Sequence, residues 1–248
     1  MSEGEGVDKL FFELASDSRL AIMEELQAGS LKMQELARKL DLTSTEAFRQ
    51  LNRLSEAQLV ARRADGAYAV TQYGRLVLFL IPSLRFAHHH REYFLAHDVW
   101  RLPPQFLSRM GEATKAELSM SAMVNINRAQ RVFMEAEQFS WGMAEGEIPE
   151  LMAPIMDERL RHGVRMRYIV PERMLPPRDE VAGLEGRLEV RGVPEIPAII
   201  GVSEKAAAVC FRFTDGRMDY AGFFGRDPEF IGWAVDLFEH YWGMARQP

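Results

Sequence analysis

Side chains able to contact nucleic acid gather between Thr43 and Thr71 of this 248-residue chain. Arginine and asparagine can pair with base edges in a major groove, whereas serine and threonine contact bases or phosphates. The candidates for such contacts are Ser44, Thr45, Phe48, Arg49, Asn52, Arg53, Arg62 and Arg63. This stretch therefore predicts an interface with double-stranded DNA.

The charge of the chain is sorted by region. Six basic and three acidic residues lie between positions 38 and 63, a balance of +3, whereas the whole chain carries −6 and the remainder therefore −9. A net-acidic protein is a poor general binder of polyanions. The positive charge is thus expected to act locally.

The apolar pattern around these residues predicts short helices followed by a hairpin. After a short N-terminal helix, Asp17 or Ser18 is expected to cap the next helix. Thr43 or Ser44 is expected to cap the helix that begins at residue 44. Asp65-Gly66, between two strand-like runs, is a hairpin signal. The three helices after the short one are expected over 19–26, 32–40 and 44–57. Helix, tight turn, helix and hairpin in this order predict a winged helix-turn-helix.

The helix over 44–57 should have two distinct faces. Ala47, Leu51 and Leu54 form an apolar stripe that is expected to face the core. A rotation of about 100° per residue then turns the polar side chains outward. The outward set is Thr45, Arg49, Asn52 and Arg53. The rival reading is a winged helix that binds a protein of the transcription machinery without reading sequence.

A long, mainly apolar helix is expected over 72–97, bent near Pro82. Its apolar residues exceed what one packed face needs, and they include Leu76, Phe79, Leu80 and Leu84. They either pack inside the chain or form a homodimer, and we expect the homodimer. A dimer would set two recognition helices about one DNA turn apart.

Beyond residue 116, strand-like and helix-like segments alternate, which predicts an α/β sheet. Residues 124–146 are expected to be helical throughout, and the Pro- and Gly-rich stretch 173–186 to be a loop. Asp227 and Pro228 should begin the last helix. The predicted fold class is α+β. Its domains are a winged helix over 1–75, a helical connector over 76–113 and an α/β sensor domain over 114–248.

Two motifs carry a family resemblance. LASDSRLAIMEELQAGSLKMQELARKLDLTSTEAFRQLNRLSEAQLV resembles ArsR-type winged-helix regulators, although Gln58 stands where glycine is usual and Phe48 where a small polar residue is common. REYFLAHDVWRLPPQFLSRMGEA looks like a segment of archaeal regulators with a methanogenesis-regulator (Fil-type) middle domain. GVRMRYIVPE and DPEFIGWAVDLFEHYW fit that family as well. Such proteins are similar to TrmB sugar-sensing regulators, which implies a winged helix joined to a phospholipase-D-like domain.

Catalysis and metal binding are not expected. Phospholipase-D chemistry needs a histidine followed two residues later by lysine, and the sequence contains no such pair. A nucleophile elbow, a Walker loop and a metalloprotease motif are also missing. His88-His89-His90 cannot grip one ion, because adjacent residues on a helix diverge. No enzyme activity, metal or cofactor is therefore predicted, and these histidines are expected at a surface or dimer interface.

A small effector is expected at the carboxyl ends of the strands of the α/β domain, where ligands of open sheets collect. An anionic or polyhydroxyl molecule, nucleotide-like compounds included, suits the donors placed there. The alternative is that the arginines pair with Glu189, Glu195 and Asp179. The candidate residues are Ser121, Asn125, Arg128, Arg173 and Arg191.

The compartment expected from the sequence is the cytoplasm. A single cysteine, Cys210, rules out an intrachain disulfide and lies in an apolar run typical of a buried thiol. The acidic N-terminus does not look like a signal peptide. The longest apolar run, at 76–82, is too short to span a bilayer, so no membrane association is predicted.

Overall fold

The computed structural model describes residues 6–145, 148–177 and 186–248, and the chain divides into two compact units. The first unit is Met1–Ile81 and the second is Pro82–Pro248. The boundary falls inside helix α5 (Gln72–His89), at the proline where a bend was predicted. Each unit is described by itself.

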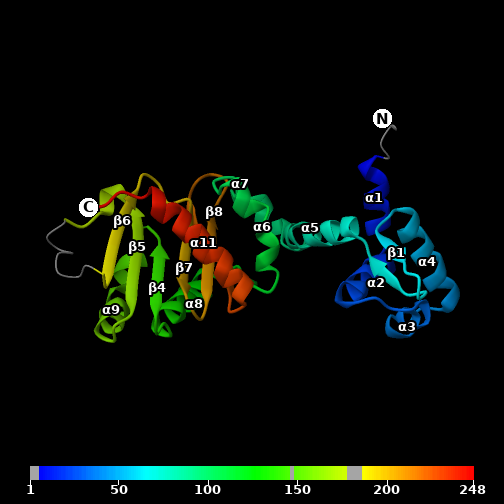
Figure 1. Ribbon diagram of the computed structural model, residues 1–248. Helices are drawn as coiled ribbons and strands as arrows, with labels where there is room; N and C mark the ends of the chain where they lie inside the picture. Colours follow the sequence, from blue (N-terminus) through cyan, green and yellow to red (C-terminus); the bar gives the residue numbers. More distant parts are fainter. Residues whose placement is uncertain (1–5, 146–147, 178–185) are drawn as a thin grey trace. The chain divides into compact units, whose positions relative to one another are not determined.

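The first unit has the element order of a winged helix-turn-helix (Figure 1). Its elements are α1 (Val7–Leu14), α2 (Asp17–Ala28), α3 (Met33–Lys39), α4 (Ser44–Glu56), the antiparallel hairpin β1 (Val60–Arg62) and β2 (Tyr68–Val70), and the start of α5. Ala47, Leu51 and Leu54 of α4 are completely buried. The predicted inward face of this helix is therefore confirmed.

Local capping explains where these helices begin. The Thr43 hydroxyl accepts a hydrogen bond from the Glu46 N–H at 3.2 Å, so Thr43 caps α4. The cap of α2 is Ser16, whose hydroxyl accepts from the Arg19 N–H, and not Asp17 or Ser18 as the sequence suggested. Asp41, in the turn between α3 and α4, has a φ of 51°, a conformation that aspartate tolerates better than most residues.

The second unit is built on a seven-stranded mixed sheet of order β3-β9-β8-β7-β4-β5-β6. β4, β5 and β6 run parallel, whereas the other neighbours are antiparallel. The strands are β3 (Glu117–Ser119), β4 (Phe139–Met143), β5 (Arg165–Pro171), β6 (Leu188–Val193), β7 (Ala198–Ser203), β8 (Ala207–Arg212) and β9 (Met218–Gly225).

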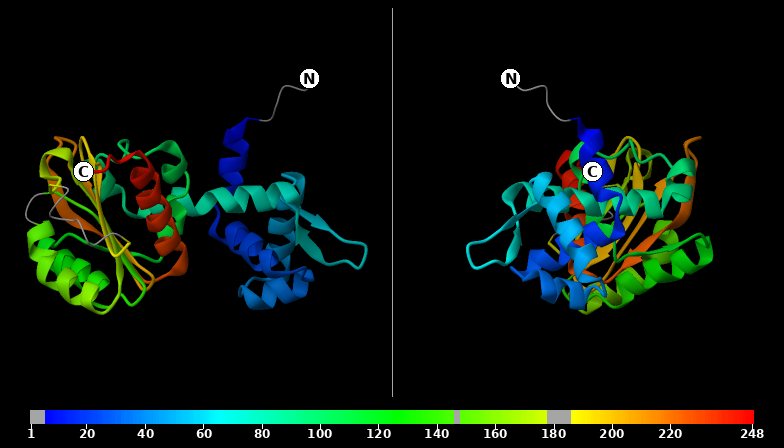
Figure 2. Two further views of the ribbon diagram at one scale, coloured as in Figure 1. Left: turned by 60° about the vertical axis from the view of Figure 1, so that its left-hand side comes forward. Right: turned by 90° about the vertical axis from the view of Figure 1, so that its right-hand side faces the viewer.

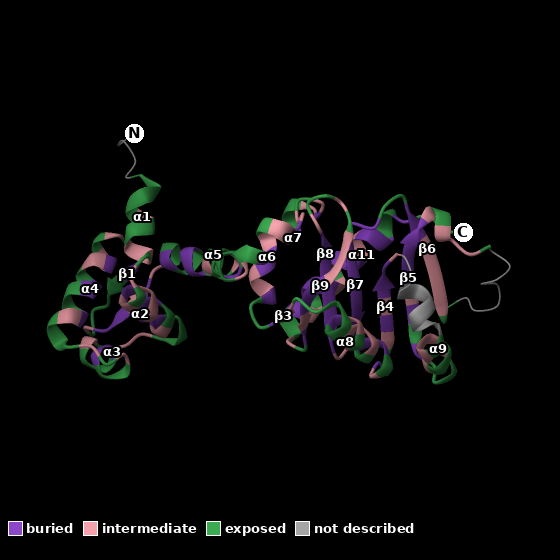
Figure 3. Cartoon of the chain, turned by 180° about the vertical axis from the view of Figure 1, so that it is seen from behind, coloured by how far each residue is buried: buried purple, intermediate pink, exposed green. Residues whose placement is uncertain are grey.

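Helices cover both faces of this sheet, as the left view of Figure 2 shows. α11 (Pro228–Met244) covers one face, where Phe238 stacks on Trp141 of β4. α8 (Ala122–Met134) and α9 (Ile148–Arg161) cover the other. Every residue of β7 and β8 is buried, which fits strands covered on both sides (Figure 3). As predicted, Asp227 caps α11 and Pro228 takes its first position.

Most of the segment predicted as a connector, from Pro82 onward, belongs to the second unit, whereas Val77 and Leu78 lie in the buried cluster of the first. It contains α6 (Arg91–Ala96), α7 (Pro104–Leu107) and the 3-10 turn η1 (Met110–Ala113). Phe86, Tyr93 and Phe106 lie in the same buried cluster as the strands and α11. The boundaries 76 and 113 therefore do not mark a separate body between two domains.

The prediction of a continuous helix over 124–146 is wrong. α8 ends at Met134, and Phe139–Met143 form the strand β4, which lies between β7 and β5. Phe139 and Trp141 point to the α11 side, where their rings contact each other, while Ser140 and Gly142 point to the other side. This alternation over five residues is too short to stand out beside the helical pattern that precedes it. In the described part of the chain, no helix has the length and apolar character needed to cross a membrane.

Candidate nucleic-acid interface

One face of α4 carries a row of exposed side chains. The residues of this α4 row are Thr45, Phe48, Arg49 and Asn52, all exposed. Their spacing of three to four residues places them on one side of the helix. Phe48 is 53% exposed, so it does not pack into the core and is free to contact a partner. Ser44 is also exposed, at the first position of the helix.

Arg53 was predicted to belong to this row, and the structure places it elsewhere. Its guanidinium donates from Nε and Nη2 to the two carboxylate oxygens of Glu13, at 3.1 and 2.6 Å. It also lies 4.9 Å from the centroid of the Phe12 ring. Because the long side chain reaches back to α1, Arg53 braces the winged helix and does not face outward with Arg49.

A buried arginine, which no sequence pattern indicated, fixes the inner side of α4. Arg19 donates to the backbone carbonyls of Phe12 and Glu13 at 2.7 and 2.8 Å, and to the Gln50 Oε1 atom at 3.1 Å. Its Nε also lies 2.9 Å from the Glu13 carboxylate. These contacts join α1, α2 and α4, so the α4 row is held facing outward.

The hairpin places two further arginines at the surface. The Asp65 carboxylate accepts from the Ala67 N–H at 3.0 Å, and Gly66 has a φ of 81°, which makes the tight turn that Asp-Gly predicted. Arg62 and Arg63 are exposed at its base. Arg63 donates to the Ser30 hydroxyl at 3.1 Å, a contact with a neutral group that leaves its charge unbalanced.

The positive charge of this surface is mostly uncompensated. Lys39 pairs with Glu25 at 2.7 Å, and Arg53 with Glu13. In the part of the chain that the structure describes, Arg49 and Arg62 have no ion-pair partner. The unpaired arginines of α4 and the hairpin are exposed, so contact with phosphates is possible there.

The predicted effector residues on α8 are engaged in internal contacts. The Asn125 amide nitrogen donates to the carbonyls of Ser119 and Tyr220, at 2.7 and 2.9 Å, and so ties β3 to β9. Ser121 caps α8. Arg128 pairs with Glu117 at 2.7 Å.

The other two effector candidates lie elsewhere. Arg173 lies 3.4 Å from the Glu145 carboxylate. Arg191 donates to the Trp242 carbonyl at 3.0 Å and lies 4.2 Å from the centroid of that indole ring, on the α11 side of the sheet. The five candidates are therefore split between opposite faces and do not form one anion site. Ion pairing was the right alternative for Arg128 and Arg173, although with other acids than expected, and Asp179 lies outside the described residues.

An apolar row on α5 is exposed, as the excess of apolar residues indicated. Leu76, Phe79 and Leu80 are 57%, 76% and 55% exposed, and Leu84 is 61% exposed. Large apolar side chains at this spacing on one helix mark a surface that is available to another protein.

The histidines form no metal site in the described residues, where no group of three or more potential ligands is found. His88 and His89 are exposed, while the His90 ring contacts Phe223 edge-on. His97, in the segment that carries the second resemblance, is buried. Its Nε2 lies 2.9 Å from the Asp219 carboxylate and its ring stacks on Tyr93. His97 therefore packs the second unit.

Comparison with protein families gives a match over the first unit. A family model described as the HVO_A0261 N-terminal domain matches residues 7–86, which include α1 to α4, the hairpin and most of α5. No curated protein matches the chain.

Solved structures that are similar to the chain share low sequence identity with it, and they include the following three. TrmBL2, an archaeal chromatin protein with a novel mode of DNA binding, is 14% identical to this chain, with a TM-score of 0.45. The matched region spans 98% of this chain and 100% of the TrmBL2 chain. The homodimeric winged helix-turn-helix domain of Mb0332 from Mycobacterium bovis, a possible ArsR-family regulator, is 21% identical with a TM-score of 0.31, covering 37% and 95%. The phospholipase D family member Nuc from Salmonella typhimurium is 12% identical with a TM-score of 0.35, covering 54% and 97%. These values are too low to transfer a function.

Proposed function

We propose that the protein is a sequence-specific DNA-binding transcription regulator that reads a major groove with α4. The α4 row carries this proposal, because it presents base-reading side chains outward while the Arg19 contacts hold the opposite side of the helix. The family model that matches residues 7–86 covers this whole winged helix.

Each side chain of the row has a definite chemical use. Arg49 can donate two hydrogen bonds to a guanine, Asn52 can pair with an adenine, and the Phe48 ring can contact a thymine methyl group. The start of α4 and its Ser44 hydroxyl favour a phosphate. Arg62 and Arg63 on the hairpin would contact the backbone, which fixes the position of α4 without reading sequence.

The active form in this proposal is a homodimer held by the exposed apolar row of α5. Burying Leu76, Phe79 and Leu80 against a second copy removes apolar surface from water and pairs two recognition helices. The second unit then acts as a Fil-type, TrmB-like sensor in the cytoplasm. An effector bound there would favour one arrangement of the dimer and thereby change its affinity for DNA.

A protein-interaction module is the second candidate, because the exposed Phe48 is also a suitable apolar anchor for a protein partner. Salt distinguishes the two functions. Phosphate contacts release counterions, so DNA affinity falls steeply as salt rises. An apolar protein contact does not behave in this way.

The test is a DNA titration. A binding site is first selected from random duplexes, and fluorescence anisotropy then gives the dissociation constant of each variant. Arg49→Ala should cost about 1–3 kcal/mol and relax one position of the site. Arg63→Ala should weaken all sequences alike and reduce the salt slope by about one. Arg131→Ala, which removes an exposed charge from α8, should change neither.

Wild-type affinity in both the Arg49 and the Arg63 variants would refute the proposal. Binding to duplex DNA that does not respond to salt would favour the interaction module instead.

A further inference from the structure

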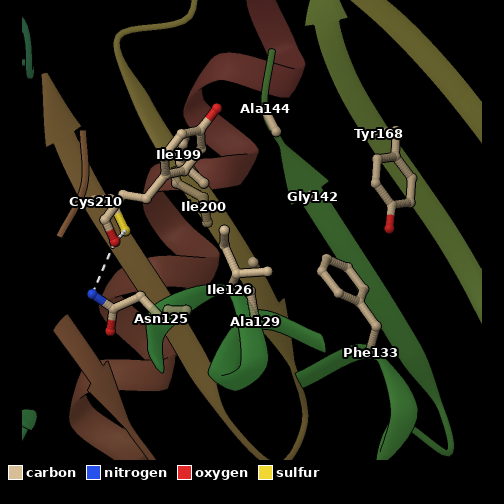
Figure 4. Close-up of a pocket in the computed structure, with 13 residues that line it drawn as sticks. Asn125, Ile126, Ala129, Phe133, Gly142, Ala144, Tyr168, Ile199, Ile200 and Cys210 are labelled. Atoms are coloured by element: carbon tan, nitrogen blue, oxygen red, sulfur yellow. Dashed lines mark hydrogen bonds between the residues drawn. The ribbon is translucent and has the colours of Figure 1, made fainter. Parts of the chain in front are cut away.

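An apolar pocket lies between α8 and the sheet of the second unit (Figure 4). Ile126, Ala129 and Phe133 of α8 line it on one side. The sheet contributes mainly small and aliphatic residues from β4, β7 and β8, with Tyr168 of β5 and Tyr220 of β9. Ile126, Ala129 and Tyr220 are half-buried and form its rim.

Paired glycines create the floor of this pocket. Gly142 of β4 lies directly opposite Gly201 of β7, so no side chain rises from the sheet at either position. A Cβ atom on Gly142 would come within 2.7 Å of the Tyr168 ring. The Tyr168 and Phe133 rings lie beside this floor, nearly parallel at 22°, with their centroids 5.8 Å apart.

The pocket is narrow. It holds about 520 Å³ of empty space when its open mouth is included, yet the centre of a water-sized sphere can reach only about 30 Å³ of it. A bulky ligand therefore does not fit, and because the rings of Tyr168 and Phe133 already lie against the glycine floor, the remaining space suits a small, flat molecule.

Tyr168 gives the pocket an unused polar group. Its hydroxyl is buried and has no hydrogen-bond partner among the described residues. Burial raises the pKa of Tyr168, so the group stays protonated and can donate. Buried hydroxyls without a partner are uncommon in proteins.

Water is a poor occupant of this space. A buried water needs two to four polar partners. The walls offer the Tyr168 hydroxyl, while the amide nitrogen of Asn125 already donates to two carbonyls. A molecule with one acceptor and an otherwise apolar body satisfies the hydroxyl and also covers the apolar walls.

We propose that the α8 pocket is the effector site of this regulator and binds a small, planar, mostly apolar molecule whose one hydrogen-bond acceptor pairs with the Tyr168 hydroxyl. The effector role rests on the proposed function, whereas the binding itself does not. This ligand class differs from the anionic one predicted from the strand ends, whose candidate residues are already engaged.

Two probes test the site, acetophenone, which has a carbonyl acceptor, and ethylbenzene, which lacks one. Saturation-transfer NMR on the full chain, titrated to saturation, gives the affinity of each. The wild type should bind acetophenone more tightly. Tyr168→Phe should weaken acetophenone about five-fold, as expected for one hydrogen bond, and leave ethylbenzene unchanged.

Filling the pocket provides the second arm. Ala129→Leu places a larger side chain at the rim and should weaken both probes at least ten-fold. Ala122→Leu makes the same change at an exposed position on the same helix, outside the pocket, and should have no effect. Circular dichroism confirms that each variant is folded.

Lack of saturable binding in the wild type, or equal affinities in the wild type, Tyr168→Phe and Ala129→Leu, would overturn the site. A DNA titration with and without acetophenone tests the effector role separately. An unchanged dissociation constant for DNA at saturating probe would overturn that role. A wild type that does not bind DNA would refute the proposed function, while the Tyr168 and Ala129 results would still decide the pocket.

Discussion

Gln58, the residue that follows the C-cap Ala57 of α4, is expected to be replaceable by glycine with a gain in stability. Its φ is 59°, in the left-handed region. The Gln58 N–H donates to the Ser55 carbonyl at 3.0 Å and the Leu59 N–H to the Leu54 carbonyl at 2.9 Å. These two bonds form a Schellman motif, which usually has glycine at this position.

Two opposing terms set the size of the effect. A side chain in the left-handed conformation costs roughly 1–2 kcal/mol, which Gln58→Gly removes. Glycine also loosens the unfolded chain, which costs about 0.4–1 kcal/mol. The side chain of Gln58 is exposed, so no packing is lost. The net gain should be about 0.5–1 kcal/mol, or roughly 2–8 °C in the melting temperature of a unit of this size.

The assay uses the distribution of tryptophan. All four tryptophans lie in the second unit, so their fluorescence reports on that unit, while circular dichroism reports on the helices of both. Gln58→Gly should raise the melting temperature of the first unit, which circular dichroism follows, and leave the melting temperature followed by tryptophan fluorescence unchanged. Gln27→Gly, in the helix α2, is the control and should cost up to about 1 kcal/mol. If Gln58→Gly lowered the transition as the control does, residue 58 would not be left-handed.

Three further predictions concern other contacts. Arg19→Leu should lower the free energy of unfolding by about 3 kcal/mol in urea, since its buried acceptors lose their donor, and a loss below about 0.5 kcal/mol would contradict this. Burial raises the pKa of the Glu204 carboxyl group. The hydrogen bonds that it accepts from the backbone N–H groups of residues 137–139 lower this pKa by a larger amount, so the net shift is downward. The stability that Glu204 adds should therefore be present above its ordinary pKa of 4.5 and fade as the pH falls through the lowered value, so Glu204→Gln should be less stable at pH 7 and approach wild type in acid. Phe79→Glu should shift the oligomer toward monomer in sedimentation velocity, whereas Leu95→Glu, also exposed, should not. A wild type that is monomeric at micromolar concentration would refute the dimer.

The winged helix could be predicted closely because the sequence signals that define its elements act between residues that are near one another in the chain. The stripe of Ala47, Leu51 and Leu54, the cap at Thr43 and the Asp-Gly turn each act within a few residues. The same periodicity identified three of the four residues of the α4 row.

Contacts between distant segments could not be predicted. Arg53 has the correct helical phase for the outer face, yet it turns toward Glu13, and the sequence around Arg53 does not indicate that partner. The floor of the α8 pocket depends on Gly142 and Gly201 being opposite each other, which follows from the pairing of β4 with β7. The sequence does not predict that pairing, because the pattern over 124–146 indicates a helix where β4 lies.

The strand order also affects how the protein folds as it is synthesised. The winged helix is made of near neighbours in sequence and can form early. In the second unit, β7, β8 and β9 are successive hairpin partners, but β3 must wait for β9, since Glu117 pairs with Phe224. Closing so long a stretch of chain is entropically costly. Phe86 and Tyr93, which pack on Phe223, remain without that partner until β9 has left the ribosome. Nascent chains that stall before β9 should therefore be strong chaperone clients, even when their winged helix is complete.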